Sequence, residues 1–355
     1  MRVVVVGAGI VGASAAFHLA DAGVDVVVVD RSHPGKATLA GAGIICPWPT
    51  AATDEELVRL YVAGAEAIPE IVDRLNELGR PDSSHRRIGA IALAADDAEL
   101  AAIERRVTDR ATGSRSIGDV QRIDGSEAQR RFPPLRSDLP GVWIEGGARL
   151  DGRAMTATLL AAAHLDPRPG DVELLVAGDR ACGVLLDGER IDADAVVAAG
   201  GAWTDALLTR HGIEVDVEPQ KGQILHLDVG DRFGSSPTDH WPSILPPGPH
   251  YLVPFEDGRV VVGATRETGS GFDTRVTVAG QREVLDAALR WAPGLAEAEL
   301  IETRVGLRPL ASSGRPTIGP LSEVDGVFIG TGLGASGLTI GPLAGRMLAD
   351  RVIGD

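Results

Sequence analysis

The sequence predicts an α/β fold in which a doubly wound, mostly parallel sheet is joined to a second, α+β part containing a mostly antiparallel sheet. The β-branched run Val3–Val6 is typical of a strand buried on both faces of a parallel sheet. A glycine-rich turn, a helical stretch over 13–22 and a second buried strand at Val26–Val29 follow it and complete one βαβ unit. Alternation of apolar and polar residues at 223–228 and 251–254 indicates antiparallel strands.

The remaining elements follow from caps, stop signals and periodicity. Thr53 or Asp54 is suited to begin a helix over 53–78, which Gly79 ends. A buried strand is expected at 191–199, and a last strand at 326–329 leads into a glycine-rich loop and a helix over 338–352. Further helices are expected at 96–111, 124–131, 152–164 and 278–291, and further strands at 88–94, 141–144 and 259–263.

These elements divide between two discontinuous domains. The length of 355 residues suits about two domains, and a hydrophobic share of 44% is enough for a sizeable core. A Rossmann-like nucleotide-binding domain is expected to comprise residues 1–82, 146–217 and 301–355. The substrate domain is expected to comprise residues 83–145 and 218–300.

Composition excludes several classes of protein. The formal net charge of −16 has the wrong sign for a protein that binds nucleic acid. Cys46 and Cys182 are the only cysteines, which is too few for a disulfide framework, and they lack metal-ligand spacing, so no metal is expected. The N-terminus has no signal-peptide pattern and no apolar run is long enough for a membrane span. We expect a cytoplasmic protein; a peripheral membrane contact and the oligomeric state are left open.

A phosphate-binding turn lies between the first strand and the first helix. Gly7, Gly9 and Gly12 match the pattern G-x-G-x-x-G, in which the glycines allow a tight turn, close approach of backbone to a pyrophosphate, and helix–strand packing. Asp30 follows about 20 residues later, where an acid reaches the hydroxyls of a ribose. The motif predicts a dinucleotide and does not distinguish NAD from FAD.

Six groups of residues resemble the D-amino-acid oxidase-like family of flavoenzymes, which includes glycine oxidase, monomeric sarcosine oxidase and D-amino-acid dehydrogenase. They are KATLAGAGIICPW (36–48), VVAAGGAW (196–203), PQKGQ (219–223), YLVP with VGATRE (251–254 and 262–267), GLRP with PTIGP (306–309 and 316–320), and TGLGASGL (331–338). They occur in the family's order along the whole chain. The resemblance implies FAD, a two-domain fold and oxidation of a carbon–nitrogen bond next to a carboxylate.

The resemblance also implies a set of cofactor-binding residues. The Gly41–Gly43 segment has no side chain larger than methyl, so its backbone can approach a flat ring, and the helix after the last glycine-rich loop would place its positive N-terminus at the flavin. Sarcosine oxidase holds its flavin covalently through a cysteine in its C-terminal third; this chain has none there, so we expect non-covalent FAD. The expected contacts are Gly7, Gly9, Ile10, Val11, Gly12, Asp30, Arg31, Ala37, Thr38, Ala40, Gly41, Ala42, Gly43, Ile44, Val172, Ala199, Gly200, Trp203, Gly332, Gly334, Ala335, Ser336, Gly337 and Leu338.

Four residues are expected at the substrate. Arg308 matches an arginine that binds the substrate carboxylate in relatives, and its planar fork suits two parallel hydrogen bonds. Tyr251 matches a tyrosine that binds the same carboxylate, although its hydroxyl is equally suited to a backbone group. Leu333 stands where the family commonly has histidine, and Trp48 either shields the flavin or fills core. Strand alternation predicts that His250 points away from Tyr251.

The leading hypothesis is oxidative deamination of a small amino acid, foremost a D-amino acid. Hydride would pass from Cα to flavin N5, giving an imino acid that hydrolyses to a 2-keto acid, and O2 or another acceptor would reoxidise the flavin. Glycine or sarcosine oxidation is the nearest alternative. A 2-hydroxy acid dehydrogenase would need a base, for which His250 is the candidate, and a non-catalytic flavin-binding subunit of a larger amine dehydrogenase is a further alternative.

Overall fold

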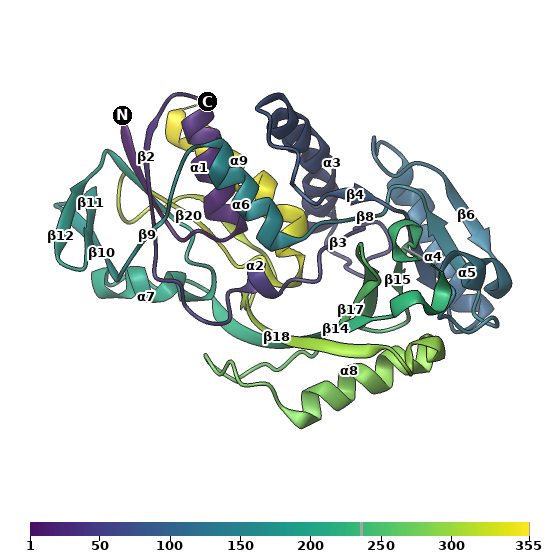
Figure 1. Ribbon diagram of the computed structural model, residues 1–355. Helices are drawn as coiled ribbons and strands as arrows, with labels where there is room; N and C mark the ends of the chain where they lie inside the picture. The colour runs from purple at the N-terminus through teal and green to yellow at the C-terminus, as the bar shows by residue number, and fades with distance from the viewer. Residues whose placement is uncertain (235–236, 355) are drawn as a thin grey trace.

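The computed structural model describes residues 1–234 and 237–354. A six-stranded sheet forms the first half of the molecule (Figure 1), and all its strands are parallel except the edge strand β19. In order across the sheet they are β19 (Thr317–Pro320), β20 (Val327–Thr331), β13 (Ala195–Ala198), β1 (Arg2–Val6), β2 (Asp25–Asp30) and β9 (Arg168–Pro169). Strand β1 lies in the interior, as its continuous β-branched run predicts.

Both faces of this sheet are covered. Val3 and Val5 pack into a core with helices α1 (Ile10–Asp21), α3 (Glu55–Glu77), α6 (Gly152–Ala162) and α9 (Gly337–Ile353). Val4 and Val6 pack into a second core on the opposite face, because successive side chains of a strand point to opposite faces. That core includes the small sheet β10 (Val172–Ala177), β11 (Arg180–Leu186) and β12 (Glu189–Asp192), and helix α7 (Thr204–Leu208).

Helices α1 and α9 pack with their backbones unusually close. A Cβ on Gly341 would lie 2.6 Å from Ile10 Cγ2, and one on Gly345 would lie 2.5 Å from Ser14 Cβ. The hydroxyl of Ser14 donates to the carbonyl oxygen of Pro342 at 2.7 Å. Glycine is therefore required at these positions of α9, since any side chain would separate the helices. Both helices follow a glycine-rich turn at the end of a parallel strand, so their N-termini lie at the same edge of the sheet.

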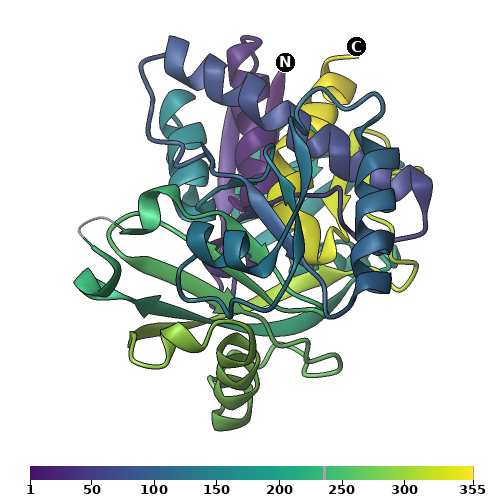
Figure 2. The same ribbon diagram turned by 90° about the vertical axis from the view of Figure 1, so that its right-hand side faces the viewer.

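An eight-stranded, mostly antiparallel sheet forms the second half. In order its strands are β18 (Glu299–Leu310), β14 (Glu218–Asp228), β17 (Arg259–Gly263), β16 (Tyr251–Pro254), β15 (Ser243–Leu245), β5 (Ala90–Leu93), β7 (Gly141–Ile144) and β6 (Val120–Ile123). The long strands β14 and β18 run between the two halves, with helix α8 (Val278–Trp291) below them (Figures 1 and 2). Leu225 and Leu227 of β14 pack with Val284 and Ala288 of α8.

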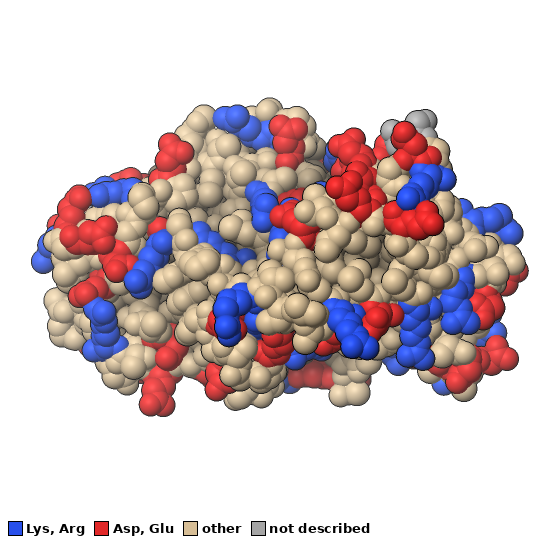
Figure 3. Space-filling model, turned by 60° about the horizontal axis from the view of Figure 1, so that its bottom comes forward, with Lys and Arg blue, Asp and Glu red and all other residues tan. Residues whose placement is uncertain are grey.

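Short elements complete the fold. The remaining helices are α2 (Ala37–Ala40), α4 (Asp97–Ala111) and α5 (Gly125–Arg131), and a small sheet contains β3 (Ile44–Ile45), β8 (Ala148–Arg149) and β4 (Arg86–Arg87). Short 3-10 helices are η1 (Gly201–Trp203), η2 (Thr209–His211), η3 (Gly230–Phe233), η4 (Pro237–His240), η5 (Pro293–Leu295) and η6 (Gly334–Ser336). Within residues 1–234 and 237–354, no helix combines the length and hydropathy that crossing a bilayer requires. Acidic and basic side chains are interspersed over the face in Figure 3.

The predicted α/β class with a second, mostly antiparallel sheet is confirmed, and Asp54 caps α3 as expected. The single strand predicted at 191–199 is wrong: the chain there forms β12 and β13, which lie in different sheets. Residues 301–310 belong to β18 and pair with β14, in the sheet that we assigned to the substrate domain. The two-domain division itself stays a prediction.

The α1–α9 contact makes one stability prediction. Gly345→Val should lower the free energy of unfolding by about 1–3 kcal/mol, because the new side chain must displace Ser14 or part the helices. Asp350→Val is the matched control, since it places the same side chain on an exposed position of α9. Urea unfolding followed by circular dichroism measures both; equal midpoints for Gly345→Val and the control would contradict the close packing.

Candidate functional site

One large cavity, of about 1130 Å³, contains most of the residues expected at the site. It extends from the turns that follow β1, β2 and β13, past α2 and the N-terminus of α9, to β14, β16 and β18. Cavities for one drug-sized ligand are usually about 300–1,000 Å³. This cavity is thus large enough for a dinucleotide together with a small second molecule.

The three glycines of the phosphate turn have different surroundings. A Cβ on Gly7 would overlap the carbonyl of Ala199, and one on Gly12 would overlap the carbonyl of Gly7. Gly9 has only the Thr38 hydroxyl near its missing Cβ, at 3.3 Å, and borders the cavity. Gly7 and Gly12 therefore let the protein pack on itself, whereas Gly9 leaves backbone open to a ligand. Gly12 does not line the cavity, which agrees with the helix–strand packing role that the motif predicts for it.

Asp30 ends β2, borders the cavity and is tightly held. Its carboxylate accepts hydrogen bonds from the backbone N–H groups of Ala8 and Ser32, both at 2.6 Å, and from Lys36 Nζ at 2.5 Å. Burial alone would raise the pKa of this carboxyl, but the hydrogen bonds outweigh burial and lower it. Asp30 thus stays ionised and fixes the phosphate turn, and sequence reasoning missed its partner Lys36. Its contact with a ribose stays a prediction.

The end of the cavity beside Asp30, the expected ribose contact, is called the adenosine end here, and it contains three further expected cofactor contacts. Arg31, Val172 and Trp203 all border it, and Arg31 forms an ion pair with Asp171. The Trp203 ring is stacked on His33, with the ring centroids 4.6 Å apart. His33 also lines the cavity and was not expected from the sequence. This end combines aromatic and apolar groups with Arg31 and Arg210, and both arginines are already paired with acids.

Most of the other expected cofactor contacts, and Leu333, which was expected at the substrate, also line the cavity. They include Ile10, Val11, Ala37, Thr38, Ala40, Gly41, Ala42, Gly43, Ile44, Ala199, Gly200, Leu333, Gly334, Ala335, Ser336, Gly337 and Leu338. Gly43 has a φ of +85°, and a Cβ there would overlap the carbonyl of Leu150, so glycine is required. Gly337 begins α9 and has nothing within 4 Å of its missing Cβ.

Besides Gly12, two expected contacts do not border the cavity. Gly332 lies behind the last glycine-rich loop, where its missing Cβ faces Ala311 Cβ at 3.2 Å. Trp48 is fully buried in a core cluster with Val142 and Ile144, and its Nε1–H donates to Ser114 Oγ at 3.1 Å. The structure thus places Trp48 in the core, the alternative that the sequence left open, and away from the substrate end.

Arg308 lies at the opposite end of the cavity from Arg31. It is on β18, and its guanidinium rests flat over Gly222 of β14, where a Cβ would overlap it. Its Nη1–H donates to the carbonyl oxygen of Thr265 at 3.1 Å. No acidic side chain among the described residues forms an ion pair with Arg308. Burial lowers the pKa of this guanidinium, which still remains charged near neutral pH.

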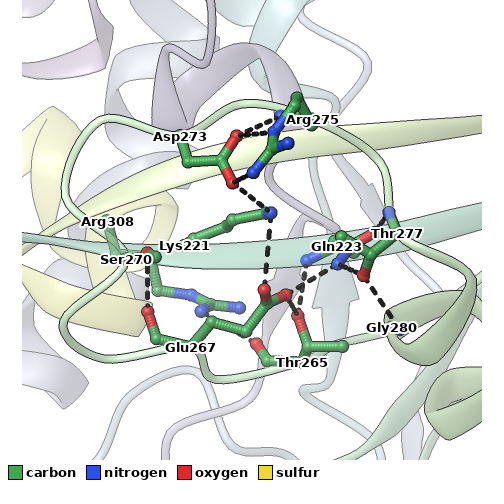
Figure 4. Close-up of polar contacts among 10 residues, drawn as sticks. All are labelled: Lys221, Gln223, Thr265, Glu267, Ser270, Asp273, Arg275, Thr277, Gly280 and Arg308. Carbon is green, nitrogen blue, oxygen red and sulfur yellow. Dashed lines mark hydrogen bonds and ion pairs between the residues drawn. The ribbon is translucent and has the colours of Figure 1, made fainter.

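A polar network on the other side of β14 explains why Arg308 is unpaired (Figure 4). In this network Glu267 accepts hydrogen bonds from Gln223 Nε2 and the Thr265 hydroxyl, both at 2.7 Å. Lys221 is only 1% exposed, and its Nζ lies 3.4 Å from Glu267 and 3.5 Å from Asp273. The Glu267 charge is therefore balanced by Lys221, and the positive charge of Arg308 stays available to a ligand.

Tyr251 and His250 complete this end of the cavity. Burial raises the pKa of the Tyr251 hydroxyl, and the nearby charge of Arg308 opposes that rise. His250 borders the cavity, but its ring is directed toward α8, which packs on the opposite face of the sheet, as strand alternation predicts. Burial lowers the pKa of His250, and its Nε2 lies 3.8 Å from a Glu283 oxygen.

The residues present fit FAD. The N-termini of α1 and α9 both face the cavity without a side-chain cap from their N-cap residues Gly9 and Ser336. The Thr38 hydroxyl accepts a hydrogen bond from Ile10 N–H of α1 at 3.0 Å. The other free N–H groups of the two first turns offer backbone donors and about half a positive charge to phosphates or to the electron-rich edge of a ring. A cavity lined by two such termini and by an arginine without an ion-pair partner suits a dinucleotide with a carboxylate beyond it.

Comparisons with known proteins agree with this geometry. The family described as FAD dependent oxidoreductase matches residues 2–351. The chain is 31% identical to glycine oxidase of Pseudomonas aeruginosa over 99% of this chain and 95% of that protein, and 41% identical to the uncharacterized oxidoreductase YurR of Bacillus subtilis over 99% and 94%.

Solved structures show the same similarity. Iminodiacetate oxidase from Chelativorans sp. BNC1 is 47% identical with a TM-score of 0.96, covering 100% of this chain and 96% of that chain. Glycine oxidase from Geobacillus kaustophilus is 28% identical with a TM-score of 0.83, covering 99% and 95%. The resemblance seen in the sequence is thereby confirmed, and so is FAD as the cofactor. The chain belongs to the FAD dependent oxidoreductase family and acts on carbon–nitrogen bonds.

Proposed function

We propose that this protein oxidises the carbon–nitrogen bond of glycine or of an N-substituted glycine, giving an imine that water hydrolyses to an oxo acid and an amine. The observation that supports this most is the unpaired guanidinium of Arg308 at the end of an FAD-sized cavity. The similar glycine oxidases and iminodiacetate oxidase point to the same class of substrate. Activity on D-amino acids, the leading expectation from the sequence, stays a prediction.

The protein's part in the reaction is to bind and orient the substrate. Arg308 binds the substrate carboxylate through two parallel hydrogen bonds, and the Tyr251 hydroxyl donates a third. Thr265 and Gly222 fix the plane of the guanidinium and therefore the position of the substrate's α-carbon. Leu333, which is buried beside the cavity, helps to exclude water from the reacting bond. When bound, FAD supplies the acceptor for the hydride that leaves the α-carbon.

The amine is oxidised in its neutral form. Of the groups that line the substrate end, His250 is the one whose ordinary pKa is near neutrality, and burial lowers that pKa. His250 is therefore neutral at pH 7 and adds no positive charge beside the amine, and we propose that the reaction needs no strong base. O2 or another acceptor then completes the cycle, and binding of FAD is proposed to be non-covalent.

Anaerobic mixing of the FAD-loaded protein with separate amines tests the proposal. Glycine, sarcosine, iminodiacetate, D-alanine and lactate are compared, and the flavin absorbance at roughly 450 nm is followed. We expect bleaching by one or more of the glycine-type amines, with glyoxylate as the oxo acid. Bleaching by D-alanine alone would favour the D-amino acid hypothesis, and bleaching by lactate alone would overturn the assignment to carbon–nitrogen bonds.

Removal of the guanidinium gives the second prediction. Arg308→Ala should lower kcat/KM by about 100-fold or more, because a charged hydrogen-bonded pair of this kind contributes roughly 3–5 kcal/mol. The FAD content should be unchanged, since Arg308 is at the far end of the cavity from the phosphate turn. Steady-state kinetics and the flavin spectrum measure the two effects; an unchanged KM for the amine would rule out the carboxylate role.

Gly222 gives a third prediction, in which activity changes although Gly222 itself is not proposed to contact the substrate. Gly222→Ala should lower kcat/KM by about tenfold or more, because the new methyl group displaces the Arg308 guanidinium. Glu218→Ala, at the exposed start of the same strand, is the control and should behave like the wild type. Full activity of Gly222→Ala would show that the position of the guanidinium is not critical.

A further inference from the structure

We propose that Arg266 forms a second carboxylate site beside Arg308, and that the preferred substrate is an amine carrying two carboxylates. This inference rests on the proposed function. It adds the chemical nature of the second substituent on the substrate's nitrogen, the one that is not oxidised. Arg266 lines the same cavity as Arg308, Tyr251 and His250. It was not among the residues expected at the substrate.

The backbone on both sides of Arg266 is fixed to β14. Thr265 N–H donates to the Gln223 carbonyl at 3.2 Å, and Glu267 N–H donates to the Lys221 carbonyl at 2.9 Å. The side chains of Thr265 and Glu267 join the polar network of Figure 4. Because residues of an extended chain alternate between faces, Arg266 points to the opposite side, where Gly222 and Arg308 border the cavity.

The link between Arg266 and Arg308 is direct. The carbonyl oxygen that receives the Arg308 Nη1–H belongs to Thr265, the residue that immediately precedes Arg266. The charge of Arg266 also contributes to lowering the pKa of Arg308 and of His250, after burial. Two guanidinium groups of like charge thus share one end of the cavity, and their repulsion is relieved when a ligand brings negative charge.

The arginines at the two ends of the cavity differ in their partners. Arg31 and Arg210, at the adenosine end, pair with Asp171 and Glu173. Arg266, at the substrate end, forms no ion pair with any acid among residues 1–234 and 237–354. A protein of net charge −16 repels a dianion at long range, so two arginines without ion-pair partners at the substrate end supply the local attraction that such a substrate needs.

An amine with one carboxymethyl group on each side of the nitrogen matches this arrangement. One carboxylate binds Arg308 and Tyr251, which orients the carbon that is oxidised, and the other binds Arg266. A monocarboxylate such as glycine or sarcosine uses only the first of these sites. Arg266 is therefore a specificity-determining residue, and its loss reduces the preference for two carboxylates over one.

Binding of two unreactive ligands tests the site without relying on turnover. Thiodiacetate has two carboxylates and (methylthio)acetate has one, and sulfur replaces the amine nitrogen in both; their dissociation constants are measured by perturbation of the flavin spectrum. In Arg266→Gln, the preference for thiodiacetate should fall by about 10- to 100-fold, the loss expected for one hydrogen bond between charged groups. Arg266→Lys should restore part of it, because the charge returns without the planar fork.

Arg80→Gln is the matched control, since it removes an exposed arginine from outside the cavity and changes the net charge equally. A preference in Arg266→Gln within about twofold of the wild type would overturn the second site. Equal weakening of both ligands would also overturn it, because Arg266 would then act on the shared carboxylate. If none of the amines bleaches the flavin of the wild type, but the two ligands bind with the expected preference, the proposed function fails and the dicarboxylate site stands.

Discussion

The close packing of α1 against α9 is the constraint on which the site depends. Gly341 and Gly345 let α9 lie directly on Ile10 and Ser14, and the Ser14–Pro342 hydrogen bond fixes the register of the two helices. Since each helix begins at a glycine-rich turn after a parallel strand, this contact brings both N-termini to one cavity. We therefore expect FAD to be held mainly by backbone donors and helix dipoles, with few charged side chains committed to it.

A second constraint is the separation of charge across β14. Lys221 and Gln223 face a network that balances Glu267 and Asp273, whereas Gly222 faces the cavity and supports Arg308. The buried lysine keeps the nearby acid from pairing with the guanidinium. Because side chains alternate along β14, the acids and Lys221 balance each other on one face, and the positive charge of Arg308 lies on the other. The cavity is therefore positive at this end, where a carboxylate would bind.

Local signals in the sequence predicted much of this architecture. The phosphate turn, Asp30 and the helix boundaries depend on neighbouring residues, so they were found from caps, glycines and periodicity. The roles of Gly222 and Arg266 were not, because they depend on which face of β14 meets which residues of distant segments. Trp48 looks the same in sequence whether it borders a cofactor or fills a core. The small sheet β10–β12 was not predicted, because its last strand and β13 follow each other closely enough to resemble one strand.

The most direct test of the account is a crystal structure of the FAD-loaded protein with (methylthio)acetate bound. The account predicts the pyrophosphate at the N-terminus of α1, beside Gly9, the flavin ring along the N-terminus of α9, and the ligand carboxylate on the guanidinium of Arg308. A carboxylate bound away from Arg308, or a dinucleotide placed outside the cavity between the two helix N-termini, would contradict it.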